Sequence, residues 1–191
     1  MNTQGRRERG FTLVESLVVV AILFIAVMLA APFLSKQIQR SKIVGAANQV
    51  GGLMRLARLD SIKTSQFGCV TVEGDIVGFS SASETCATRT KILAGGQVTL
   101  PKNVTASVSD FDDGTPWVAI FRSDGSLREA GEVRLETPEL GSGGRHCMKV
   151  RVAPAATGRV VIEKWDAAIN EYHTNGSPKA WDWTPITGSC P

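Results

Sequence analysis

Glu15 is the one ionisable side chain in an apolar run that extends from Phe11 to Leu34. A run of about twenty apolar residues is long enough to cross a bilayer as a helix. A carboxylate at the centre of such a helix costs about 2.5–3.5 kcal/mol on insertion scales, so it usually has a partner or a task. Two interpretations stay open: Glu15 lies near the membrane edge and reaches water, or it pairs with a cation supplied by another helix.

Few other residues suggest catalysis. The chain has two histidines, His146 and His173, and its sequence contains no H-E-x-x-H motif, phosphate-binding glycine loop or Gly-x-Ser-x-Gly motif. The carboxylates of "DFDDGT" (110–115), which include Asp110 and Asp113, could hold calcium, but they lack the ligand spacing of an EF-hand. An acidic surface turn is the favoured interpretation. We therefore expect no enzyme activity, no cofactor and no metal site.

All four cysteines lie downstream of the apolar run: Cys69, Cys86, Cys147 and Cys190. An even number of cysteines behind an export-like segment indicates disulfides in an oxidising compartment. Three pairings are possible, and the pairing of Cys69 with Cys86 and of Cys147 with Cys190 needs the shortest loops. The spacings include no close cysteine pair of the kind that structural zinc sites use. Two disulfides with this pairing are therefore favoured.

The distribution of charge predicts the orientation of the chain in a membrane. Residues 1–10 carry three arginines and one glutamate, which leaves a net charge of +1 of the total +3 for the remainder. A basic flank stays cytoplasmic, so everything after Leu34 should be translocated. A cleaved signal peptide is disfavoured because the apolar run is too long and Pro32 follows Ala31, a poor context for cleavage. The near-neutral remainder excludes a general polyanion-binding charge.

The stretch "RGFTLVESLVVVAIL" resembles the leader and N-terminal helix of type IV pilins and type II secretion pseudopilins. The shared features are a short basic leader that ends in glycine, then Phe-Thr-Leu, then glutamate at the fifth mature position. The resemblance implies that a prepilin peptidase/methyltransferase cuts between Gly10 and Phe11 and methylates the amino group of Phe11. That amino group would be largely protonated near neutral pH. Glu15 of a neighbouring subunit could pair with it inside the helix stack of a filament.

The helical pattern continues after the apolar run. Small and apolar residues recur at spacings of three and four, at Ile43, Ala47, Val50, Met54, Ala57 and Ser61. One helix is therefore expected over residues 11–64, with residues 11–34 in the membrane. Pro32 should kink it and serve in assembly, because proline removes a helix hydrogen bond.

Three glycines lie within the second half of this helix, at positions 45, 51 and 52. Each lowers helix stability by roughly 1 kcal/mol relative to alanine. Close packing of the helix against the head is the favoured explanation. The alternative is local melting of the helix during assembly.

After Thr64 the periodicity changes to two, which predicts strands. A hairpin is expected at 69–73 and 76–79, with Gly74 in its turn. Further strands are expected at 97–100, 104–108, 117–121, 132–136, 147–152 and 159–165. The predicted fold class is therefore α+β, a long N-terminal helix packed on an antiparallel β-sheet head. The expected parts are the leader (1–10), the helix (11–64), the head (65–165) and an aromatic-rich tail (166–191).

Four further segments make the chain similar to the GspH/FimT group, which includes minor pseudopilin H of type II secretion and the minor pilins FimT and FimU. They are "RLARLDSIKTS", "WVAIFRSDGSL", "EVRLE" and "CMKVRVAPAATGRVVIE". The resemblance implies an inner-membrane subunit with a periplasmic head, whose partners are other minor pilins or pseudopilins and the major pilin. FimT-like members that serve transformation carry a DNA-binding Gly-Arg-x-Arg motif. The aligned stretch here is Gly158-Arg159-Val160-Val161, so the second arginine is missing.

A basic segment keeps DNA binding open as an alternative. Residues 143–165 carry a local net charge of +4. Four of its cations are candidate phosphate contacts: Lys149, Arg151, Arg159 and Lys164. A solvated strand face that is charged to prevent edge pairing is favoured, because the mature chain has too little net charge to steer DNA.

A structural minor pilin or pseudopilin that helps to initiate or cap filament assembly is thus the favoured function. The alternatives are a DNA-binding minor pilin and a plain membrane-anchored periplasmic protein.

Overall fold

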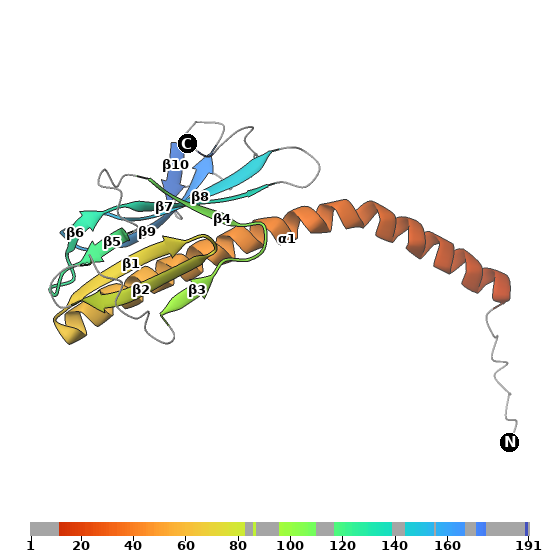
Figure 1. Ribbon diagram of the computed structural model, residues 1–191. Helices are drawn as coiled ribbons and strands as arrows, with labels where there is room; N and C mark the ends of the chain where they lie inside the picture. The colour runs from red at the N-terminus through yellow and green to blue at the C-terminus, as the bar shows by residue number, and fades with distance from the viewer. Residues whose placement is uncertain are drawn as a thin grey trace, which may run out of the picture. The chain divides into compact units, whose positions relative to one another are not determined.

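The structure is a computed structural model of the chain. It describes residues 12–82, 86, 96–109, 117–138, 144–154, 156–166, 171–174 and 190. The chain divides into two compact units, residues 1–37 and 38–191. Helix α1 (Leu13–Thr64) begins in the first unit and ends in the second (Figure 1).

Helix α1 is continuous over 52 residues, so Pro32 does not end it. The side chains of Leu13–Ala31 are all exposed in the single chain. This part of α1 is long and apolar enough to cross a membrane. The helix ends at Thr64, where the sequence predicts the change from helical to strand periodicity.

The head contains two five-stranded antiparallel sheets. Sheet A has the order β3-β2-β1-β5-β6 and contains β1 (Phe67–Glu73), β2 (Ile76–Ala82), β3 (Gln97–Thr99), β5 (Trp117–Phe121) and β6 (Leu127–Ala130). Sheet B has the order β10-β9-β8-β7-β4 and contains β4 (Thr105–Ser109), β7 (Glu132–Pro138), β8 (Arg145–Val152), β9 (Val160–Asp166) and β10 (Glu171–Thr174).

All eight predicted strands are confirmed, with small shifts at their ends. The single predicted sheet is two sheets, because β4 pairs with β7 and not with a strand of sheet A. Two strands were not predicted: β6 and β10. Strand β10 extends sheet B into residues 166–191, which the sequence analysis assigned to a tail. The aromatic residues Trp181 and Trp183 lie outside the described residues.

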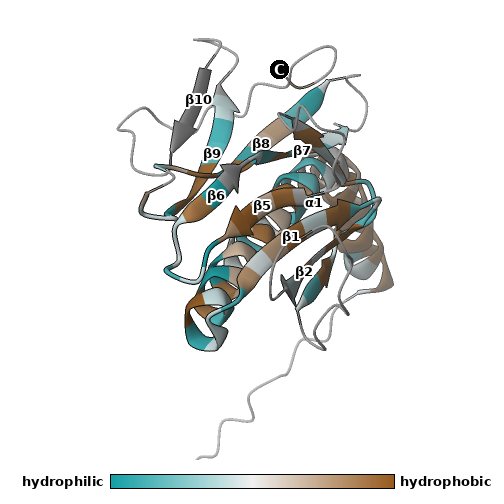
Figure 2. Ribbon diagram, turned by 60° about the vertical axis from the view of Figure 1, so that its left-hand side comes forward, coloured by the Kyte–Doolittle hydropathy of each residue, from teal (hydrophilic) through white to brown (hydrophobic). Residues whose placement is uncertain are grey.

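The second half of α1 and the inner faces of both sheets form one core. All six residues of the predicted helical stripe are fully buried: Ile43, Ala47, Val50, Met54, Ala57 and Ser61. The five apolar residues of this stripe pack in one cluster with Val70 and Phe121 of sheet A and with Leu135 and Val150 of sheet B. Figure 2 shows the hydrophobic segments of β1, β5 and β8 lying over α1. The helical period therefore places one side of α1 against two sheets.

Polar contacts also hold α1 to each sheet. The Thr137 hydroxyl of β7 donates a buried hydrogen bond to Gln39 Oε1 at 3.1 Å. The Ser81 hydroxyl of β2 donates to Asp60 Oδ2 at 2.7 Å. Because a buried polar group is costly without a partner, such bonds fix the register of the helix against the strands.

The glycines of α1 have different surroundings. A β-carbon on Gly51 would lie 3.0 Å from Ile162 Cδ1 of β9, so this glycine allows close packing. A β-carbon on Gly45 or Gly52 would meet nothing within 4 Å. The packing explanation therefore applies to Gly51 and not to the other two positions.

Both disulfides join the pairs with the shortest loops, Cys69–Cys86 and Cys147–Cys190. The first links β1 to the segment after β2, with a sequence separation of 17 residues. The second links β8 to the end of the chain, with a separation of 43 residues. The last segment of the chain is therefore covalently tied to sheet B.

Candidate functional site

The expected processing site, Gly10 and Phe11, lies outside the described residues. Helix α1 begins just after it, at Leu13, and Thr12 caps its first turn. The Glu15 backbone N–H donates to Thr12 Oγ1 at 3.2 Å, which is the hydrogen bond of an N-cap residue. Thr12 and Glu15 also have the T-x-x-E spacing of a capping box, a signal that the sequence analysis missed.

The cap gives Glu15 a local physical reason for its position. A carboxylate in the first turn of a helix is stabilised by about 0.3–1 kcal/mol, because the helix dipole is positive there. The side chain of Glu15 is exposed. Within the described part of the chain its carboxylate makes no ion pair. The carboxylate is therefore placed at the helix start and is available to a cation from outside this chain.

The four candidate DNA-binding cations do not share one face. Strands β8 and β9 form the predicted antiparallel hairpin, with Lys149 opposite Glu163 and Met148 opposite Lys164. Adjacent residues on a strand point to opposite faces, so Lys164 lies on the face opposite to that of Lys149 and Arg151. Arg159 precedes β9.

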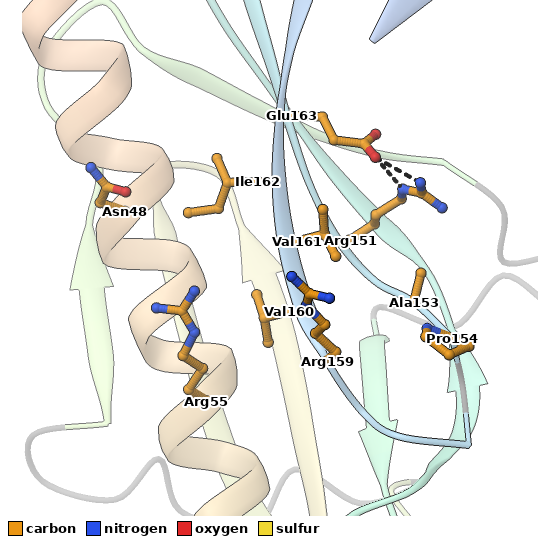
Figure 3. Close-up of a pocket in the computed structure, with 10 residues that line it drawn as sticks. All are labelled: Asn48, Arg55, Arg151, Ala153, Pro154, Arg159, Val160, Val161, Ile162 and Glu163. Carbon is orange, nitrogen blue, oxygen red and sulfur yellow. Dashed lines mark hydrogen bonds and ion pairs between the residues drawn. The ribbon is translucent and has the colours of Figure 1, made fainter. Parts of the chain in front are cut away.

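Ion pairs neutralise two of these cations. Arg151 donates from Nε and Nη2 to Glu163 Oε1, at 2.9 and 2.6 Å (Figure 3). Hydrogen bonding by Glu163 raises the pKa of the Arg151 guanidinium above its usual value. Lys149 Nζ lies 3.1 Å from Glu132 Oε2 and 3.9 Å from Glu163 Oε2. Glu132 also pairs with Arg134, at 2.7 Å. The outer face of sheet B is thus a network of paired charges.

The local charge of residues 143–165 overstates how basic this face is. Glu132 comes from β7, outside that segment, and becomes a neighbour of Lys149 through strand pairing. Charge counting along the chain does not show such pairs. The network agrees with a charged, solvated strand face and offers few unpaired cations to a phosphate backbone.

Two other arginines are exposed and lie at the same pocket. Arg55 of α1 and Arg159 line a pocket of about 670 Å³ beside β9, together with Asn48, Val160 and Ile162 (Figure 3). Among the described residues, neither guanidinium has a hydrogen bond or an ion pair. The sequence analysis listed Arg159 but missed Arg55, since only the packing of α1 on sheet B brings them to one pocket.

The backbone before Arg159 lies at a junction where the β8–β9 turn, the β5–β6 turn and helix α1 meet. Gly158 has a φ of +59°, and a β-carbon there would overlap the Gly125 carbonyl oxygen. Arg58 Nε of α1 donates to that same oxygen at 3.0 Å. Gly158 lies between β8 and β9, and Gly125 between β5 and β6. The glycine that precedes Arg159 therefore has a structural function, which is to join the two sheets on α1.

Hydrogen bonds within the β5–β6 turn stabilise its side of this junction. Asp124 Oδ1 accepts from the backbone N–H and the hydroxyl of Ser126, at 2.8 and 2.6 Å. These bonds lower the pKa of the Asp124 carboxyl. The acidic cluster at residues 110–115, in contrast, lies outside the described residues.

Comparisons with known proteins add one specific match. The family model described as "Prokaryotic N-terminal methylation motif" matches residues 5–31. The match spans the end of the basic head, Thr12, Glu15 and most of the exposed apolar part of α1. No curated protein matches the chain. The methylation motif and the apolar helix together fit a chain that is anchored in a membrane and has a separate head.

Three solved structures are similar in fold. The minor pseudopilin EpsH from the type 2 secretion system of Vibrio cholerae is 12% identical, with a TM-score of 0.47, over 63% of this chain and 96% of that one. The type IV minor pilin FimU of Pseudomonas aeruginosa PAO1 is 14% identical in two crystal forms. Its TM-scores are 0.45 and 0.43, over 63% and 62% of this chain and 87% and 90% of those chains. At these sequence identities and TM-scores, the functions of EpsH and FimU cannot be assigned to this chain.

Proposed function

We propose that this chain is a minor pilin or pseudopilin that helps to initiate or cap assembly of a type IV pilus or a type II secretion pseudopilus. The match of residues 5–31 to the methylation motif carries this proposal. The motif coincides with a helix that begins at Leu13 and has an exposed apolar surface. Such a surface needs a bilayer or other apolar helices around it.

These features suggest an order of processing, membrane anchoring and assembly for the chain. A prepilin peptidase on the cytoplasmic side of the inner membrane removes residues 1–10 and methylates the new amino group of Phe11. Residues 11–34 hold the protein in the membrane, and the head lies in the periplasm, where both disulfides are stable. The chain then enters a pilus or pseudopilus beside other minor subunits and the major pilin.

Glu15 supplies the contact between subunits in this proposal. Its carboxylate is exposed in the first turn of α1, and the dipole of its own helix supports the charge. The protonated amino group of Phe11 lies four residues before Glu15 in the sequence, so in a neighbouring subunit it is a cation that could pair with this carboxylate. Because charges in a low-dielectric stack cost several kcal/mol each when unpaired, the pairing would set the register between helices.

The two alternative functions have less support than the proposed one. DNA binding lacks the second arginine of the motif, and Lys149 and Arg151 are committed to ion pairs. A plain membrane anchor explains the length of the apolar run but not the methylation motif. We also propose no enzyme activity for the chain.

Mass spectrometry of the mature protein, purified from its native membrane, tests the proposal. We expect the chain to begin with N-methylated Phe11, and a Gly10→Ser variant provides an uncleaved control. An intact Met1, or a first residue near Ala31, would overturn the assignment to this class.

A further inference from the structure

Strand β9 has a neighbouring strand along one of its two edges for only part of its length. Strand β10 pairs with residues 163–166 of β9 and with none before them. Val160–Ile162 pair with β8 on the other side. Within the described part of the chain, no strand lies against their second side. Unpaired strand edges are templates for another strand.

The hydrogen-bond pattern indicates which backbone groups face this open edge. The Ala153 N–H donates to the Arg159 carbonyl at 2.8 Å, so these two residues form a hydrogen-bonded pair. In antiparallel sheets such pairs alternate with pairs that do not bond to each other. Val161 therefore bonds to β8, whereas the N–H and C=O groups of Val160 and Ile162 point away from β8. These groups match the spacing of an added strand.

The surroundings of the edge are apolar and positively charged. Val160 and Ile162 form the wall toward α1, where Ile162 lies against Gly51. Arg55 and Asn48 of α1 line the pocket on that side, and Arg159 lines it beside Val161 (Figure 3). Both guanidinium groups are without a partner among the described residues. Cations on both faces of a strand edge complement an acidic strand.

We propose that the Val160–Ile162 edge binds an extended, acidic segment of a partner subunit as an added strand. The backbone of that segment would bond to Val160 and Ile162, and its carboxylates would pair with Arg55 and Arg159. Strand addition gives affinity through the main chain and selectivity through side chains on alternate faces. This inference deepens the proposed assembly function and rests on it, because it names one contact between subunits.

One observation favours a peptide over a nucleic acid at this place. Val160 and Ile162 offer backbone groups and an apolar wall, which suit an extended peptide.

Fluorescence anisotropy with the full-length chain in detergent micelles tests the proposal. The probe is a labelled peptide of four Glu-Val repeats, acetylated and amidated at its ends. We expect saturable binding that weakens about tenfold in Arg159→Gln and in Arg55→Gln, because each variant removes a charge-assisted hydrogen bond. Lys102→Gln, an exposed cation between β3 and β4, is the matched control and should bind as the wild type does.

Two further probes separate strand addition from simple charge attraction. A peptide of the same sequence with N-methyl groups on alternate residues keeps its charge but loses half of its donors, so it should bind at least tenfold more weakly. Equal binding of this peptide, or no binding of the parent peptide, would overturn the proposal. A 20-nucleotide single-stranded DNA that binds as tightly as the peptide and competes with it would overturn it as well.

Hydrogen exchange of the free chain tests whether the edge is open. The amides of Val160 and Ile162 should exchange quickly and become protected by the acidic peptide. Protection without peptide would mean that the chain covers its own edge, and the proposal would be wrong. The mature N-terminus of both arginine variants should still be methylated Phe11, so failure at this site is distinguishable from failure of the proposed function.

Discussion

The two halves of helix α1 differ in what surrounds them, although they belong to one continuous element. In the first half, apolar side chains cover every side, and Leu23 and Phe24 are about 60% exposed, at 59% and 62%. In the second half, a single stripe that includes Ile43 and Val50 is fully buried against the head. The same helical backbone therefore serves two purposes. Where apolar residues lie on every side, the helix is exposed in the single chain, and where they form one stripe, the helix packs on the head.

Removing the carboxylate of the first half should have the largest effect. We expect Glu15→Ala to be processed and inserted normally but to be at least tenfold depleted from filaments sheared off the cells. The physical reason is that the amino group of the neighbouring subunit would be buried without its counter-charge. Immunoblots of sheared and cell-bound fractions measure the effect.

Thr12→Ala is the matched control for that experiment. It removes the N-cap, at a cost of about 1 kcal/mol in helix stability, but it keeps the carboxylate. We expect this variant to enter filaments. Normal incorporation of Glu15→Ala would refute the pairing of charges, and equal loss in both variants would assign the effect to the cap.

Truncating one apolar side chain in each half should sharpen the comparison in stability. Met54 is fully buried, and Met54→Ala should lower the free energy of unfolding of the head by about 2–5 kcal/mol. Leu23 is exposed in the single chain, so Leu23→Ala should leave unfolding of the head unchanged within about 0.5 kcal/mol. Denaturant titration in detergent, followed by tryptophan fluorescence, compares the two. A similar loss in both variants would show that the halves do not act separately.

The smallest effect concerns two adjacent glycines in the second half. Gly52→Ala should raise the free energy of unfolding by about 0.5–1 kcal/mol, because alanine favours the helix and its β-carbon meets nothing within 4 Å. Gly51→Ala should give a smaller gain or a loss, since its β-carbon would lie 3.0 Å from Ile162 Cδ1. The same denaturant titration measures both. Equal gains would show that β9 does not pack closely on α1 at this point.

The helix and the type of most strands were predictable because their signals are local. Every residue of the stripe from Ile43 to Ser61 was identified by its spacing, and the helix does bury that stripe. The capping box at Thr12 and Glu15 was readable in the same way and was overlooked. Local hydrogen bonding and periodicity act over a few residues, so a single sequence contains them.

The division of the strands into sheets was not predictable from these signals. Strands β6 and β10 are four residues long, and each lies at the edge of its sheet. In Leu127–Ala130 the two central residues are both charged, so the segment does not alternate apolar with polar residues. Pairing with β5 and β9 makes these segments strands.

The sequence by itself determined that one half of α1 is apolar all round, that the other half has a buried side, and that a methylation motif spans the end of the basic head and the apolar half. Only the tertiary structure decided that Glu132 neutralises Lys149, that Arg55 joins Arg159 at one pocket, and that the start of β9 has an open edge. The physical reason is the distance along the chain between the residues that interact. Periodicity depends on neighbours along the chain, whereas charge pairing and strand edges depend on the register between segments far apart in it.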